Sequence, residues 1–348
     1  MRIRLPYVLV ASLVLAASAP STAQTSIAEA RRTAQQAYRR AMAEARELYQ
    51  GRRGPQQSET FSRKLRVGRD GRVSISNISG AITVAAAAGD EVSIDAVKRG
   101  RGDRSDLDRV RIVVEERPGR VDVRTDYDRS FFRENYVSVD YTVVVPAGAS
   151  LDLHSVSGQL KVDGVNGSVR LGTVSGYIRA SRTPKVESVR TVSGEVDLGE
   201  ISEADSLAIS SVSGNIRLAG VKARSLNLST VSGEMRVRDA ACELLVAKGL
   251  SGNFEYSGTL ARNGRYDVNS HSGEVRFTIS DRPGFELNAV SFSGAVHSDF
   301  PLTVGGDRTR NLNQRRGPRN SSVRATFGDG SASLNLRTFS GNVSILKN

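Results

Sequence analysis

From Phe61 onward, apolar and polar residues alternate along the chain, which predicts short β-strands with one buried face. A Ser-Gly pair recurs within this pattern at intervals of 18 to 21 residues. Eight copies follow one another in phase: Ser157-Gly158, Ser175-Gly176, Ser193-Gly194, Ser213-Gly214, Ser232-Gly233, Ser251-Gly252, Ser272-Gly273 and Ser293-Gly294. Two more copies, Ser79-Gly80 and Ser340-Gly341, flank this array.

Two apolar columns appear when the repeats are aligned on this pair. Four residues before the serine stand Leu153, Leu171, Val189, Ile209, Leu228, Ala247, Val268 and Ala289. Three residues after it stand Leu160, Ile178, Val196, Ile216, Met235, Phe254, Val275 and Val296. The next residue is polar or charged in nearly every copy, so each repeat holds two strands that present one face to a core.

One such repeat is too small to bury its own apolar face. If successive repeats stack about 4.8 Å apart, equivalent side chains form continuous apolar columns. The sequence therefore predicts an all-β, single-chain parallel β-solenoid with coils of about nineteen residues. A propeller needs longer repeats for its four-stranded blades. An antiparallel sandwich would not require the same columns in every repeat.

The Ser-Gly pair is expected at a corner of each coil, where a Cβ on the glycine would meet the neighbouring coil. A hydroxyl residue stands two places before the serine in most repeats, as in Thr173 and Thr191. These hydroxyls either satisfy backbone groups at the corner or form an exposed array that binds ice or glycan. The sequence leaves open whether the valines in between, such as Val174 and Val192, face inward or outward. The number of sheet faces in each coil is also open.

The N-terminal residues have the pattern of a secretory signal. Arg2 and Arg4 precede a short apolar stretch, and Ser21-Thr22-Ala23 fits signal-peptidase cleavage, so residues 1–23 are expected to be removed. Residues 24–50 have helical apolar spacing and predict an amphipathic helix, and 51–60 read as a linker. No later apolar run is long enough to cross a bilayer. The expected location is the periplasm, the cell surface or the outside.

The remaining chain divides around the repeats. Residues 61–150 are less regular and are expected to cap the N-terminal end of the solenoid, which would otherwise expose unpaired strand edges. Residues 151–348 hold the repeats, an Arg-rich insertion at 305–322 and an expected C-terminal cap at 331–348.

The chain is basic, with a formal net charge of +12, so an anionic partner has to be considered. The Arg-rich insertion is the best candidate contact, through Arg308, Arg310, Arg315, Arg316 and Arg319. An envelope glycan, lipopolysaccharide or an envelope protein would fit such a surface. Nucleic acid is not expected, since the insertion has no aromatic residue and the protein is expected to be exported.

Catalytic chemistry is not apparent in the sequence. Glu195 and Glu234 would lie two coils apart, near the separation of an inverting glycosidase, but regular surface glutamates are expected in any case. His154, His271 and His297 fall in different phases of the repeat, which argues against a shared site. The single cysteine, Cys242, is expected as a small buried residue. No catalytic residue, cofactor or metal ligand is predicted.

The repeated Thr-Val-Ser-Gly-Glu-Val type motif, together with the strand ending Val143-Val144-Val145-Pro146, resembles a bacterial putative-adhesin family with β-strand repeats, domain of unknown function 4097. The similarity covers roughly residues 61–348 and implies an envelope-associated or secreted β-repeat protein. We therefore expect a noncatalytic, adhesin-like scaffold that makes multivalent contacts with a surface, glycan or protein. The alternatives are a glycan-active β-helix enzyme and a periplasmic sensor or regulator of envelope stress.

Overall fold

The computed structural model describes residues 56–101, 104–128, 137–280, 284–304 and 321–348. The predicted signal peptide and amphipathic helix lie outside these residues. The described chain is nearly all-β, as predicted, with 23 strands in one sheet and one short helix, α2 (Ser105–Asp108). In this part of the chain no helix is long and apolar enough to span a membrane.

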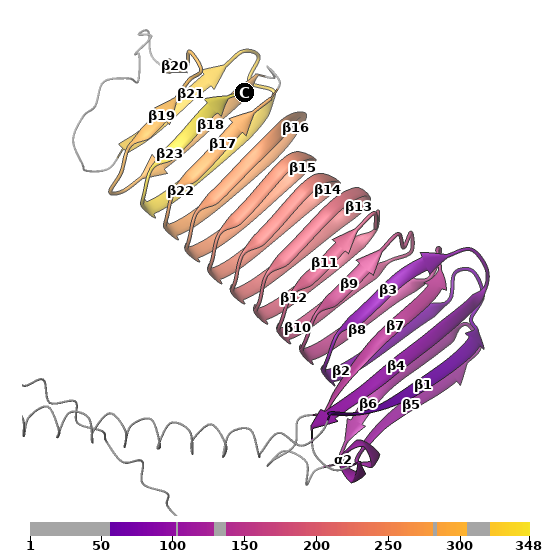
Figure 1. Ribbon diagram of the computed structural model, residues 1–348. Helices are drawn as coiled ribbons and strands as arrows, with labels where there is room; N and C mark the ends of the chain where they lie inside the picture. Colours follow the sequence, from indigo (N-terminus) through magenta and orange to yellow (C-terminus); the bar gives the residue numbers. More distant parts are fainter. Residues whose placement is uncertain (1–55, 102–103, 129–136, 281–283, 305–320) are drawn as a thin grey trace, which may run out of the picture. The chain divides into compact units, whose positions relative to one another are not determined.

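The centre of the molecule is a stack of coils whose strands pair in parallel (Figure 1). On one face β8 (Ser150–Ser157), β10 (Val169–Ser175) and β12 (Val186–Ser193) lie side by side. On a second face β9 (Leu160–Asp163) pairs with β11 (Ile178–Ser181). The chain crosses from the first face to the second at each Ser-Gly pair.

Four longer strands continue the stack. Each runs from the second face of one repeat into the first face of the next, and each pairs in parallel with its neighbour. They are β13 (Val196–Ser213), β14 (Ile216–Ser232), β15 (Met235–Ser251) and β16 (Phe254–Ser272). Left-handed backbone at residues such as Glu200 and Asp239 bends these long strands around the coil.

The corners lie directly over one another, as the repeat predicts. Ser193 is in register with Ser213, and Ser213 with Ser232. Gly214 has φ +149°, and an ideal Cβ built on it would lie 2.0 Å from the carbonyl oxygen of Gly194 in the preceding coil. The repeated glycine therefore allows the backbones of neighbouring coils to approach one strand spacing at the corner.

Both predicted apolar columns are buried. All sixteen of their side chains are at most 8% exposed, and Leu153, Val189, Ile178 and Val196 are completely buried. Toward the C-terminal end the interior holds an aromatic cluster: Phe254, Tyr256, Tyr266 and Phe277. Alternation along each strand therefore produces one core that runs the length of the stack.

The pairing becomes mixed at the N-terminal end. The coil made of β2 (Arg72–Ser79) and β3 (Ile82–Ala87) packs in parallel between β8/β9 and the pair β6 (Arg120–Tyr127)/β7 (Ser138–Pro146). Three antiparallel strands follow outside it: β5 (Val110–Arg117), β4 (Glu91–Arg101) and β1 (Gln56–Arg66). The sequence Arg117-Pro118-Gly119-Arg120 predicts the hairpin that joins β5 to β6, but the antiparallel strands β4 and β1 are not part of the expected parallel solenoid.

The predicted linker at 51–60 is wrong in its second half. Residues 56–60 begin β1 and pair antiparallel with residues 97–101 of β4. Their polar side chains do not signal a strand, but backbone hydrogen bonds to an exposed edge do not require apolar side chains.

The C-terminal end also departs from the prediction. Residues 331–348 were expected to form the cap, but β22 (Ala332–Ser340) and β23 (Val343–Lys347) lie inside the stack. They insert between β16/β17 (Val275–Ile279) and β18 (Phe285–Ser291)/β19 (Val296–Ser298). The outermost strands are antiparallel, β21 (Ser321–Phe327) and β20 (Thr303–Val304). An interior coil is stabilised on both sides, which a cap is not.

Candidate interaction surface

One column of apolar side chains faces solvent along the corners. In the coils from Ser157 to Ser293, the residue directly before the serine points outward, because the residue before it points into the core, and it is apolar in every coil except that of His271. Where it is apolar, its exposed fraction is nearly constant, between 46% and 53%. We call this column the apolar ladder; it consists of Val156, Val174, Val192, Val212, Val231, Leu250, Phe339 and Phe292, in the order in which they stack. The orientation that the sequence left open is therefore outward.

Aromatic rings form one end of the apolar ladder. His271 stands at the corner between Leu250 and Phe339, and its ring stacks on Phe339 with centroids 5.0 Å apart. Phe339 stacks in turn on Phe292, with centroids 4.7 Å apart. The ladder is thus narrow over its five valine coils and wider at its aromatic end.

The hydroxyl column lies on the inner side of the same corner. Thr173, Thr191 and Thr230 are only 5% to 6% exposed. Thr173 and Thr230 donate side-chain hydrogen bonds to the carbonyl oxygens of Ser175 and Ser232, at 3.4 and 3.2 Å. The alternative of an exposed array of these hydroxyls for ice or glycan is therefore wrong. Thr173 and Thr230 satisfy corner backbone, whereas the buried hydroxyls of Ser155, Thr191, Ser211 and Ser270 have no hydrogen-bond partner among the described residues.

A shallow groove of about 310 Å³ lies beside the apolar ladder, on the outer face of β12 to β15. Its floor consists of small or neutral side chains, including Ser210, Asn227 and Ser229. Arg190 and Lys248 stand at its two ends, in register positions three coils apart. We call this the central groove; its described lining contains no carboxylate.

The two cations of the central groove differ from their neighbours. On nearby faces Arg170 pairs with Glu187 at 2.8 Å, Arg217 with Glu195 at 3.0 Å and Arg236 with Glu255 at 2.7 Å. Neither Arg190 nor Lys248 makes an ion pair with a described residue. Their charges are therefore available to an external anion.

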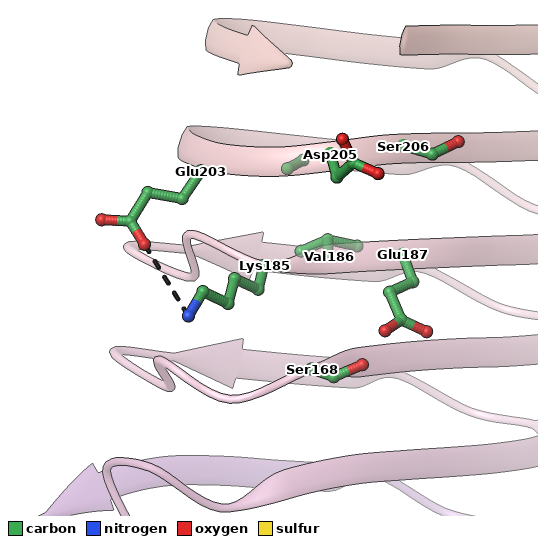
Figure 2. A pocket seen from close by; sticks show the side chains of 8 residues that line it. Ser168, Lys185, Val186, Glu187, Glu203, Asp205 and Ser206 are labelled. Carbon is green, nitrogen blue, oxygen red and sulfur yellow. Dashed lines mark ion pairs between the residues drawn. The ribbon is translucent and has the colours of Figure 1, made fainter. Parts of the chain in front are cut away.

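A second groove, of about 430 Å³, lies nearer the start of β12 and is lined by residues 185–187 and 203–206 (Figure 2). Its charged groups are already paired. Lys185 and Glu203 reach toward each other from neighbouring coils, with 3.9 Å between nitrogen and oxygen. A hydrogen bond from Ser168 holds the pKa of Glu187 below its usual value, and Arg170 lowers it further. Asp205 is bound by Arg224 at 2.8 Å. These contacts hold neighbouring coils together and leave little charge for a ligand.

Glu195 and Glu234 are held by arginines as well. Arg217 binds Glu195, and this hydrogen bond keeps the pKa of Glu195 below its usual value. Arg236 lies 2.5 Å from Glu234. A glycosidase acid needs the opposite environment, one that raises the pKa so that the carboxyl stays protonated. The arrangement therefore does not favour the glycan-cleaving alternative.

The three histidines each contact a different residue. His154 lies 2.8 Å from Asp152, His297 lies 3.1 Å from Asp299, and His271 stacks on Phe339. Among the described residues, no group of three or more His, Cys, Asp or Glu side chains is placed to hold a metal ion. The five arginines of the predicted insertion, Arg308 to Arg319, lie outside the described residues.

Cys242 is buried, as predicted, and is 4% exposed. Burial raises the pKa of its thiol to about 12, so almost no thiolate exists at neutral pH. We expect the native protein to react very slowly with a thiol reagent at pH 8 and at the normal rate in urea. A Ser202→Cys variant provides the comparison, because its added thiol would be exposed and away from the corners. Equally fast labelling of Cys242 in the native state would contradict the buried assignment.

Comparison with known proteins gives a family and distant structural similarity. Among curated proteins, none matches this sequence. A "putative adhesin" from Bacteroides fragilis NCTC 9343 is 11% identical, with a TM-score of 0.42, covering 83% of this chain and 97% of that one. A "putative lipid binding protein" from Parabacteroides distasonis ATCC 8503 is 15% identical, with a TM-score of 0.41, covering 64% and 90%. Similarity at this distance carries no inference about ligands.

The family assignment rests on the repeat region itself. Residues 72–346 match the family described as Toastrack DUF4097, which spans all the coils from β2 to β23. The resemblance drawn from the Ser-Gly motif is confirmed by this match. This chain belongs to the Toastrack DUF4097 family.

Proposed function

We propose that this protein is a noncatalytic, exported scaffold of the bacterial envelope, adhesin-like in function, that binds an acidic glycan along its stacked coils. The signal-like residues 1–23 support export. The central groove is the observation that carries the glycan assignment.

The chemistry of the central groove suits a chain with widely spaced anionic groups. Three coils separate Arg190 from Lys248, which corresponds to about 14 Å at the usual strand spacing. Between them, the hydroxyls of Ser210 and Ser229 and the amide of Asn227 offer donors and acceptors for sugar hydroxyls.

Acidic protein is the competing partner class. An acidic peptide would satisfy the two cations, but the floor of the groove offers no unpaired sheet edge, because β13 and β14 are paired on both sides. The backbone of a peptide could not add to the sheet there. A glycan, which binds through hydroxyls and ring faces, fits the floor better.

Binding of polygalacturonate tests this proposal. We expect replacing both Arg190 and Lys248 by alanine to weaken binding by about tenfold, since two charge-assisted contacts are lost. The matched control replaces Lys222 and Arg238, two exposed cations outside the groove, with the same change in net charge. Isothermal titration at several salt concentrations measures both variants, with neutral dextran as a second control.

Two outcomes would contradict the proposal. Equal loss in the two double variants would show that net charge alone governs binding. Polyglutamate binding as tightly as polygalacturonate would show that the sugar contributes nothing. We propose that Arg308, Arg310, Arg315, Arg316 and Arg319 add long-range attraction for the same anionic partner.

A further inference from the structure

We propose that the apolar ladder is the interface through which two copies of this chain associate, antiparallel and about a two-fold axis perpendicular to the ladder. This inference goes beyond the glycan-binding proposal and does not depend on it. It rests on the length, spacing and taper of the ladder.

The apolar ladder is as large as the largest apolar patches that monomeric proteins expose. Eight apolar side chains at about half exposure present roughly 600 Å² in one stripe that only the ring of His271 interrupts, and stripes of this size mark interaction sites. Two copies would bury roughly 1,200 Å² through the ladder alone, the lower bound of a stable interface. The flanking residues would add to this area.

The spacing of the apolar ladder specifies its partner. Each coil contributes one side chain, so the apolar groups recur about every 4.8 Å over a length of about 40 Å. The stacked rings at 4.7 and 5.0 Å have this spacing. A partner fits between these side chains only if it presents apolar groups at the same interval. The same ladder on a second copy does so.

The taper of the apolar ladder favours the antiparallel arrangement. With His271 included, nine corner positions run from Val156 to Phe292, and Val231 is at the centre. With the centres aligned, the narrow end of each copy meets the aromatic end of the other: Val156 faces Phe292 and Val174 faces Phe339. A large side chain then meets a small one at both ends of the contact, with Val231 against Val231 at the centre. In a parallel pair the aromatic ends would meet each other and hold the valine ends apart.

The flanks of the apolar ladder permit close approach. On one side stand the repeated serine and glycine of the corner, which are small. On the other side, Lys248 of one copy would lie opposite Ser210 of the other, and Arg190 opposite Asn269, so no two of these cations meet. Glu195 would approach Glu274, but Arg217 and Arg276 bind these carboxylates at 3.0 and 3.4 Å.

A membrane is a poorer occupant of the apolar ladder. Glu195, Glu234 and Glu274 follow the corner two residues after the serine, and would be pressed against the lipid head groups. Anionic lipid would repel these carboxylates, and burying them would cost free energy. A second copy leaves them at the rim, in water.

Sedimentation of the purified full chain over a concentration series tests the association. We expect a dimer whose dissociation constant rises at least about tenfold in Val231→Glu, which places a charge at the centre of the interface. Ser202→Glu, an equal charge change at an exposed polar position between corners, should leave it unchanged. Thermal unfolding of both variants checks that the fold is retained. A wild-type monomer at every concentration, or equal effects of the two variants, would overturn the proposal.

Single cysteine variants test the antiparallel arrangement. Val231 lies on the two-fold axis, so Val231→Cys should form a disulfide between copies on mild oxidation, visible on a non-reducing gel. Val174→Cys should not form this disulfide, because the residue opposite it is Phe339. The native Cys242 is buried and is not expected to form a disulfide. Equal cross-linking of both variants would overturn this arrangement.

Binding to anionic vesicles that competes with the dimer would assign the ladder to lipid instead. The groove variants Arg190→Ala and Lys248→Ala report on glycan separately.

Discussion

Replacing Gly214 by alanine is expected to destabilise the protein by about 3–5 kcal/mol, because a backbone clash and an unfavourable conformation coincide there. The added Cβ would lie 2.0 Å from the carbonyl oxygen of Gly194, and that carbonyl belongs to the neighbouring coil. The residue also has φ +149°, which side-chain-bearing residues rarely adopt. Neither problem is relieved by rotating a side chain.

The clash propagates because each corner is bonded to the next. The amide of Gly214 donates to the carbonyl of Ser232 at 3.0 Å, and that of Gly194 donates to Ser213 at 3.1 Å. Moving one corner therefore disturbs the corners on both sides, as in any stack held by nearest-neighbour contacts.

Urea unfolding followed by circular dichroism measures this effect. Gly199→Ala is the matched control, since an ideal Cβ there meets no atom within 4 Å and the residue is outside the left-handed set. We expect that control to change stability by less than about 1 kcal/mol. Similar stabilities for Gly214→Ala and Gly199→Ala would refute the role assigned to the repeated glycine.

Truncation of Phe277 to alanine is expected to cost about 3–5 kcal/mol, the range for emptying an aromatic site in a packed core. The ring is completely buried and stacks on Tyr256, with centroids 5.0 Å apart. It also packs against Phe254 at 5.8 Å and Tyr266 at 6.5 Å. These rings come from neighbouring coils, so the cavity would loosen contacts between coils.

The same substitution at an exposed ring shows how much of the stability loss comes from burial of the ring and how much from removing an aromatic side chain. Phe292 is 52% exposed, so Phe292→Ala should cost far less than Phe277→Ala when unfolding is measured on dilute monomer. Phe277→Leu should recover part of the loss, because it refills most of the volume. Equal losses of stability in the two alanine variants would show that the buried aromatic cluster does not stabilise the C-terminal part of the stack.

Local features in the sequence were sufficient to predict the repeat geometry. Alternation assigns Leu153 and Leu160 to the core without knowledge of any partner, since successive side chains on a strand point to opposite faces. The phase of the Ser-Gly pair placed the corners over one another. The buried state of Cys242 follows from its position in the same pattern. Each of these depends on a few neighbouring residues.

The orientation of the corner valines depends on the bend itself. Thr173 turns inward and bonds to the backbone of Ser175, which forces Val174 outward. Alternation from Leu171 places Val174 outward only if the strand runs unbroken to Ser175, and the sequence alone does not show where the bend begins. The sequence therefore identifies each residue of the apolar ladder but does not predict that these side chains form an exposed column.

The ends of the stack and the central groove were decided by tertiary structure alone. Nothing in the motif of Ser340-Gly341 distinguishes a terminal coil from one that inserts between two earlier coils, because the strand pairing is equally good in both places. Arg190, Ser210 and Lys248 come from different repeats, and they form a groove only when three intervening strand pairings bring them onto one face. Sequence determines which face a side chain occupies, while the order of stacking determines its neighbours.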